Sequence, residues 1–357
     1  MQRVFFTFCF MLTCVFGIAA ELAEEIEFRP EVNDAPIKVT GEILVEAQDG
    51  GVLMLADDGY IWTIQPNQIV KRNKLEVPMT PVSTAEMKRR LMEQNKGFEV
   101  YQTAHYIILH NTNERYAKRV STLFEQLYKG FFAYWENQGW ELPEPRFPFV
   151  AMVFANRDDY LQYSLPQVGE TAKAVLGYYD LRNNRMITYF NRNLERNIAT
   201  LVHEATHQLA YNCKVQTRYA DNPKWVSEGL AMFFESPDFK SPKGWRAIGK
   251  VNQVNLSRWR NYQRNRPAES LVTLLADDSR FNNASTALAA YGESWALTYF
   301  LIKTRREKYV SYLRELSKGK RLIERTKKER IEMFESSFGE TIVGLDKAFV
   351  TYMRRIR

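Results

Sequence analysis

Residues 195–210 read ERNIATLVHEATHQLA, and this stretch decides the fold. Its apolar residues recur at helical spacing and predict an amphipathic helix: Ile198, Leu201, Val202 and Leu209. Residues four apart lie on one face of a helix, so the imidazoles of His203 and His207 can reach one ion. Glu204 projects beside them, where it can take a proton from a water at the metal. The alternative is a helix that carries two buried histidines; with four histidines in the chain, this pattern arises by chance in roughly one such chain in several hundred.

A catalytic zinc ion usually has three protein ligands, so a third must be found. The extended motif H-E-x-x-H-x-x-G-x-x-H needs glycine at 210 and histidine at 213, but the chain has Ala210 and Cys213. Cys213 could bind zinc as a thiolate. A cysteine near a helix end is more often a small hydrophobic residue of the core.

A second pattern follows at residues 225–231, which read WVSEGLA. Asn222 can cap a helix here and Pro223 suits its first turn, so Glu228 is expected on a helix that packs across the histidine helix. A carboxylate at this place completes a His-His-Glu set around one Zn²⁺ ion. Glu235 and Asp221 are the local rivals.

These paired motifs resemble those of the gluzincins, notably aminopeptidase N-like enzymes and the peptidase MA-like group of largely uncharacterised bacterial secreted proteins. The resemblance covers residues 195–235, and more loosely extends to about 300. It implies His203, His207 and Glu228 as zinc ligands and Glu204 as the general base of a zinc-dependent metallopeptidase. Aminopeptidases of this type also carry a Gly-Ala-Met-Glu-Asn loop that holds the substrate's amino terminus. Residues 177–189 offer only Asp180 as an acid, which favours an endopeptidase.

Peptide hydrolysis also needs a donor for the oxyanion, and the chain has no histidine after His207. Tyr291, ahead of an apolar helical run, resembles the helper tyrosine of related gluzincins, and Tyr299 is the second candidate. Glu293 is a candidate to orient a metal-bound imidazole. In zincin folds an extended strand before the metal helix binds the substrate backbone, and residues 186–190 are expected to serve.

The order of elements predicts an α+β protein. Residues 37–70 alternate apolar and polar positions around the turn sequences at 49–51 and 57–59, which predicts a small β domain at residues 21–77. A linker is expected at 78–96. Residues 97–357 are expected to form a zincin-like domain with strands near 98–109 and 149–154, a helix at 114–135, a hairpin of 175–179 with 186–190, and a helical C-terminal half.

The first 20 residues have the pattern of a secretory signal peptide. Arg3 precedes the apolar run 4–16, and small residues follow at Gly17, Ala19 and Ala20. We therefore expect a secreted or periplasmic protein without stable membrane insertion; an uncleaved anchor or lipidation at Cys14 are the alternatives. Cleavage would leave Cys213 as the only cysteine, which excludes an internal disulfide.

The net charge of +7 is spread over charges of mixed sign, so no nucleic-acid site is expected. Three classes of function remain: a zinc hydrolase acting on a peptide or protein substrate, a metal-binding scaffold of little activity, and a cell-envelope binding protein that works through its β domain. Glu204 favours the first, because a scaffold has no use for a general base.

Overall fold

The computed structural model describes residues 22–31, 33–192, 194–236 and 248–357. The predicted signal peptide, residues 1–20, lies outside them. The described chain divides into two compact units. The smaller contains the residues up to Asp57 together with Thr63–Thr80, and the larger contains Asp58–Trp62 and Pro81–Arg357.

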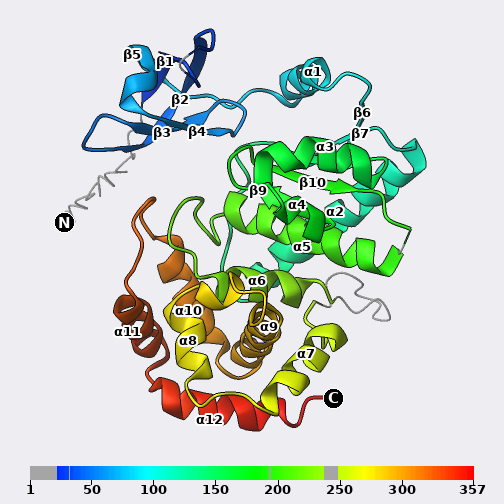
Figure 1. Ribbon diagram of the computed structural model, residues 1–357, viewed down its shortest axis with the longest axis vertical. Helices are drawn as coiled ribbons and strands as arrows, with labels where there is room; N and C mark the ends of the chain where they lie inside the picture. Colours follow the sequence, from blue (N-terminus) through cyan, green and yellow to red (C-terminus); the bar gives the residue numbers. More distant parts are fainter. Residues whose placement is uncertain (1–21, 32, 193, 237–247) are drawn as a thin grey trace, which may run out of the picture. The chain divides into compact units, whose positions relative to one another are not determined.

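The smaller unit is a five-stranded sheet in the order β4-β3-β2-β1-β5 (Figure 1). Its elements are β1 (Leu22–Phe28), β2 (Ile37–Glu46), β3 (Val52–Ala56), β4 (Ile61–Ile64), a 3-10 turn at Pro66–Gln68 and β5 (Ile69–Pro78). Strand β1 pairs antiparallel with both β2 and β5. The predicted turn after β2 is present, since Gly50 adopts a φ of +91° and the Asp49 carboxylate accepts a hydrogen bond from the Gly51 amide.

The larger unit begins with α1 (Thr84–Gln94), within the stretch expected as a linker. It continues with a mixed sheet in the order β6-β7-β8-β10-β9. The strands and the helices between them are β6 (Glu99–Gln102), β7 (Tyr106–His110), α2 (Glu114–Glu136), β8 (Phe149–Phe154), α3 (Arg157–Val168), α4 (Thr171–Ala174), β9 (Gly177–Asp180) and β10 (Arg185–Tyr189). Strands β7, β8 and β10 are parallel, and β9 pairs antiparallel with β10 as the predicted hairpin.

The sheet is covered on both faces, because alternate residues of its central strands enter two separate cores. Tyr106 and Ile108 of β7 pack with α2 and the histidine helix, whereas Ile107 and Leu109 pack with α1 and α3. Every residue of β7 and β8 is buried, as expected for strands with helices on both sides.

The remainder of the larger unit is helical, which confirms the expected α+β order. Its helices are α5 (Leu194–Asn212), α6 (Lys224–Phe234), α7 (Gln253–Gln263), α8 (Ser270–Ala276), a 3-10 turn at Ser279–Phe281, α9 (Ala287–Thr304), α10 (Arg306–Ser317), α11 (Lys327–Phe338) and α12 (Ile342–Met353). Helix α9 is the core of this half, because α6, α7, α10 and α12 pack around it (Figure 1).

Within the residues that the structure describes, no helix has the length and apolarity needed to cross a bilayer.

Candidate metal centre

Three predicted ligands converge in the structure. His203 and His207 lie on α5, one turn apart, and Glu228 reaches them from α6. The Nε2 atom of His203 lies 3.2 Å from the Nε2 atom of His207 and 3.1 Å from a carboxylate oxygen of Glu228. The second oxygen of Glu228 lies 3.9 Å from His207 Nε2. One ligand atom from each residue lies within 4.8 Å of the others, and no second such group occurs in the described chain.

The spacing of these atoms fits a zinc ion. Zinc binds nitrogen at about 2.0–2.1 Å and carboxylate oxygen at about 2.0–2.2 Å, so neighbouring ligand atoms on a tetrahedron lie about 3.3 Å apart. The two imidazole nitrogens are 3.2 Å apart and the nearer Glu228 oxygen is 3.1 Å from His203, which are both close to that value. The side chains are 12–18% exposed, which leaves an open side for a fourth ligand. Two imidazoles and one carboxylate with an open position are a donor set that catalytic zinc uses.

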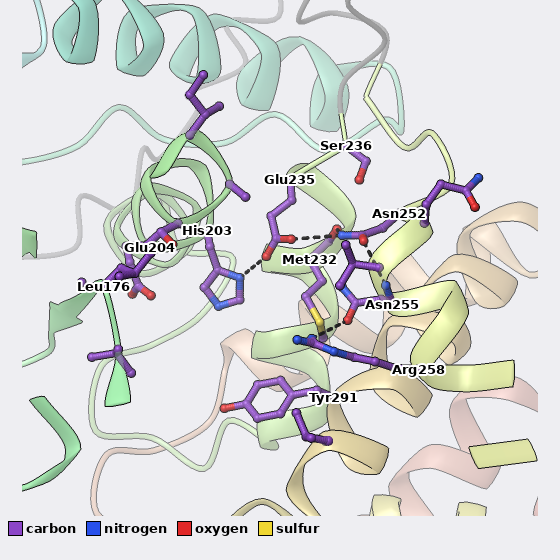
Figure 2. Close-up of a pocket in the computed structure, with 18 of the residues that line it drawn as sticks. Leu176, His203, Glu204, Met232, Glu235, Ser236, Asn252, Asn255, Arg258 and Tyr291 are labelled. Atoms are coloured by element: carbon purple, nitrogen blue, oxygen red, sulfur yellow. Dashed lines mark hydrogen bonds and ion pairs between the residues drawn. The ribbon is translucent and has the colours of Figure 1, made fainter. Parts of the chain in front are cut away.

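The orientation of His203 is set by Glu235, at the C-terminal end of α6. A carboxylate oxygen of Glu235 lies 2.5 Å from His203 Nδ1, and its other oxygen accepts a hydrogen bond of 3.0 Å from the Asn252 amide (Figure 2). A proton on Nδ1 donated to Glu235 leaves the lone pair of Nε2 free for a metal. Glu235 is therefore the carboxylate that would support His203 as a ligand. It contacts Nδ1, whereas Glu228 lies at Nε2, so Glu235 does not compete with Glu228 for the metal position.

Glu293 does not have the orienting role expected for it. It is fully buried and pairs with Arg266 and Arg280, and it accepts a hydrogen bond from Ser270. That prediction was wrong because the helical spacing of α9 points Glu293 away from the metal ligands, into the interface with α8.

The two other rivals for the third ligand are also placed elsewhere. Cys213 is fully buried in the hydrophobic core at the end of α5, where burial raises the pKa of its thiol. Asp221 forms ion pairs with Arg325 and Arg330. Neither residue is part of the convergent group.

Charge is distributed unevenly over the ligands. Burial opposes a charge on His203, but hydrogen bonds from its ring to Glu228 and Glu235 outweigh burial and raise its pKa well above the usual value. At His207, burial outweighs the negative charge of Glu228, 3.9 Å away, and lowers the pKa to about 4. Burial disfavours the charge on Glu228, yet the hydrogen bond to His203 lowers its pKa. The site thus holds a carboxylate charge and a neutral imidazole ready for a cation.

Glu204 lies beside the ligands without joining them. Its carboxylate accepts a hydrogen bond of 2.9 Å from the backbone amide of Tyr179 in β9. Burial raises the pKa of Glu204 to about 7, because its effect is larger than that of the positive charge of His203, which lowers this pKa. A carboxyl group in that range can both take and return a proton near neutral pH.

A cavity of about 1180 Å³ opens in front of this site. Its lining includes His203, Glu204 and Tyr291. The negative charge of Glu228, together with burial, raises the pKa of Tyr291, so its hydroxyl keeps its proton and remains a donor. Tyr299, the second candidate, is absent from the described lining and instead packs against Trp295. Tyr291 is the tyrosine that the structure brings to the site.

The strand that faces the cavity is not the one expected from the sequence. Residues 185–189 form β10, which is hydrogen-bonded to β8 on one side and to β9 on the other, so it has no free edge for a substrate. Strand β9 lies at the edge of the sheet, and Leu176 and Gly177 at its start line the cavity. The hairpin was predicted, but which of its strands lies at the edge depends on the parallel pairing of β10 with β8.

Helix α6 approaches α9 closely at Gly229, next to the third ligand. A Cβ atom on Gly229 would lie 2.1 Å from the Thr298 hydroxyl and 2.9 Å from the Ser294 carbonyl oxygen. Only glycine therefore permits this helix packing, which explains the glycine that follows Glu228 in the motif.

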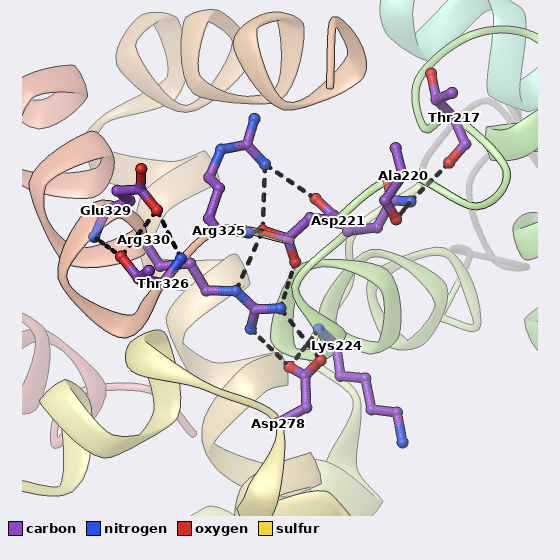
Figure 3. Close-up of polar contacts among 10 residues, drawn as sticks. Thr217, Ala220, Asp221, Lys224, Asp278, Arg325, Thr326, Glu329 and Arg330 are labelled. Atoms are coloured by element: carbon purple, nitrogen blue, oxygen red, sulfur yellow. Dashed lines mark hydrogen bonds and ion pairs between the residues drawn. The ribbon is translucent and has the colours of Figure 1, made fainter. Parts of the chain in front are cut away.

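The start of α6 is fixed by the C-terminal part of the chain. Asp221 lies between Arg325 and Arg330, and Arg330 also pairs with Asp278 at 3.1 Å (Figure 3). Asp278 in turn accepts a hydrogen bond of 3.0 Å from the backbone amide of Lys224, the first residue of α6. The position of Glu228 thus depends on residues a hundred positions further along the chain.

The predicted cap of α6 was wrong. Asn222 uses its side-chain amide to donate to the carbonyl oxygens of Thr217 and Ala220, and the N-cap residue is Pro223, which has no side-chain cap. The Asp278 carboxylate takes the place of the cap.

Comparison with known protein families adds one finding. Residues 197–323 match a family described as a protein of unknown function, DUF1570. The matched segment contains all three ligands, Glu204 and Tyr291, and it runs from α5 to the turn after α10. No curated protein matches this chain.

Proposed function

We propose that this protein is a zinc-dependent metallopeptidase of the gluzincin type, in which His203, His207 and Glu228 hold the ion and Glu204 is the general base. The observation that carries the proposal is the meeting of three potential ligand atoms within 4.8 Å of one another, beside the Glu204 carboxylate, which is not among them. A purely structural zinc site takes four protein ligands, so the open position favours catalysis.

The chain's own residues supply the remaining chemistry. Zinc, when bound, would polarise the substrate carbonyl and lower the pKa of a water to about 7. Glu204 takes the proton as the water oxygen attacks the carbonyl carbon, and returns it to the amine nitrogen as the C–N bond breaks. The Tyr291 hydroxyl donates to the oxygen that becomes negative.

The edge of β9 is the proposed place for the substrate backbone. The Tyr179 amide points away from β10 to Glu204, and backbone groups alternate along a strand, so Gly177 presents its amide and carbonyl on the same side. An extended peptide can pair with this edge and lie across the cavity. The same edge also holds Glu204 through the Tyr179 amide, so a substrate bound there would lie next to the general base.

The test combines metal analysis with peptide cleavage. We expect the wild-type protein and Glu204→Gln to hold one zinc per chain, and only the wild type to cleave an acetylated and amidated peptide library analysed by mass spectrometry. His207→Ala should lose both zinc and cleavage. Protein purified without chelators that holds no stoichiometric zinc would contradict the proposal. Zinc in both forms with cleavage in neither would support the metal-binding scaffold instead.

A further inference from the structure

Arg258 on α7 lines the cavity, and it has no carboxylate partner among the residues that the structure describes. Its Nη1 atom donates a hydrogen bond of 2.9 Å to the amide oxygen of Asn255, and no ion pair joins it to another described residue. Asn255 is buried and is held in turn by a hydrogen bond from its own backbone amide to Asn252. The guanidinium group is therefore oriented by a neutral partner, and its charge is not neutralised.

The two acidic residues of the described cavity lining, Glu204 and Glu235, already have hydrogen-bond partners. Both oxygens of Glu235 have partners, one in His203 and one in Asn252. Glu204 is held by the Tyr179 amide. Because the carboxylates that line the cavity already have partners, the guanidinium group can bind a carboxylate of a substrate. Its planar fork of N–H donors matches the two oxygens of a carboxylate.

The base of the Arg258 side chain is fixed close to Tyr291. A Cβ atom on Gly292, the next residue of α9, would lie 2.9 Å from Arg258 Cβ, so α7 and α9 touch at this point. The charge of Arg258 also acts on the Tyr291 hydroxyl. In the view of Figure 2, the Arg258 guanidinium lies between Met232 and the Tyr291 ring, on the wall opposite Leu176 and Glu204. A substrate that reaches Tyr291 therefore comes within range of Arg258.

The same wall carries exposed apolar side chains. Val254 lies one helical turn before Arg258 and is 62% exposed, and Leu288 lies one turn before Tyr291 and is 63% exposed. A peptide in the cavity would meet one cationic side chain together with exposed apolar side chains.

We propose that Arg258 is a specificity-determining residue that binds a carboxylate of the substrate, so that the protein selects peptides with an acidic group near the scissile bond. This inference rests on the proposed peptidase function. The carboxylate has two sources, an aspartate or glutamate side chain within the peptide and the terminal carboxylate of the chain.

The test measures binding apart from turnover. The probes are an acetylated and amidated heptapeptide of alanine, leucine and glutamine, its variants with one glutamate at each position, and the parent peptide with a free carboxyl terminus. Their affinities for zinc-loaded Glu204→Gln are compared by calorimetry. We expect at least one peptide with a carboxylate to bind about tenfold more tightly than the neutral parent, since Arg258 is solvent-exposed and a charged hydrogen bond there is of modest strength. Internal glutamate variants and the free-acid peptide distinguish the two sources.

Matched variants assign the preference to one side chain. Arg258→Gln in the Glu204→Gln background should bind acidic and neutral peptides equally. Arg260→Gln, which removes an exposed arginine of the same helix that does not line the cavity, should keep the tenfold preference. A preference that survives Arg258→Gln, or no preference in the parent protein, overturns the inference. If the wild type cleaves no peptide, the proposed peptidase function is contradicted. The role of Arg258 is still tested in that case, because the affinities for acidic and neutral peptides are measured without turnover.

Discussion

Replacement of Glu235 by glutamine tests how the metal ligands are supported. The two oxygens of Glu235 accept from His203 Nδ1 at 2.5 Å and from the Asn252 amide at 3.0 Å. Glutamine keeps the shape but has one oxygen and one NH₂ group, so one of these two donors would face another donor. Loss of a carboxylate behind a metal-bound histidine typically weakens metal affinity by about 10- to 100-fold, which is about 1.4–2.7 kcal/mol.

The assay is competition for zinc between the protein and a chromophoric chelator at pH 7.5. Glu235→Gln should raise the zinc Kd by about 10- to 100-fold, and Glu228→Gln, which removes a ligand, should raise it further. Glu136→Gln, at an exposed position at the end of α2, is the control and should leave the Kd unchanged. If Glu235→Gln were the more damaging change, Glu235 would be the ligand and Glu228 the support. An unchanged Kd in Glu235→Gln would refute the orienting role.

Three further predictions follow from the packing around the site. Gly229→Ala should lower the free energy of unfolding by about 1–3 kcal/mol in urea titrations, because the new methyl group meets the Thr298 hydroxyl; unchanged stability would mean that α6 and α9 are not packed this closely. Tyr291→Phe should lower kcat by about 100-fold with zinc retained, whereas Tyr299→Phe should not, and equal effects would argue against an oxyanion role for Tyr291. Cys213→Ala should keep one zinc per chain, and loss of the metal in that variant would reopen thiolate ligation.

Local rules of sequence were enough for the features that depend on neighbouring residues. The four-residue spacing placed His203 and His207 on one face of α5. The start of α3 follows the same kind of local rule, since the Asn156 side chain accepts a hydrogen bond from the Asp159 amide. The hairpin of β9 and β10 was likewise predicted from its turn residues; Asn184 adopts a φ of +61°, a conformation that asparagine tolerates.

Features that depend on distant residues could not be predicted in this way. The cap of α6 comes from Asp278, 54 residues after the Lys224 amide that it accepts from. Glu235 was considered as a rival ligand, but its role as a partner of Nδ1 depends on how the His203 ring is turned between Glu235 and Glu228. Glu293 was expected to orient a metal-bound imidazole, but helix geometry turns it to Arg266 and Arg280.

The division of the ligands between two helices has a consequence for stability. His203 and His207 belong to α5, which packs on the sheet, whereas Glu228 belongs to α6, which packs on α9 in the helical half. A zinc ion would link these two parts, and an ion that binds only the folded state stabilises it by an amount that grows with the ratio of free ion to Kd. The ion pairs of Asp221 with Arg325 and Arg330 already hold the start of α6. The fold therefore positions Glu228 without a metal, and in the proposed zinc protein the free energy of zinc binding would not be needed to assemble the site.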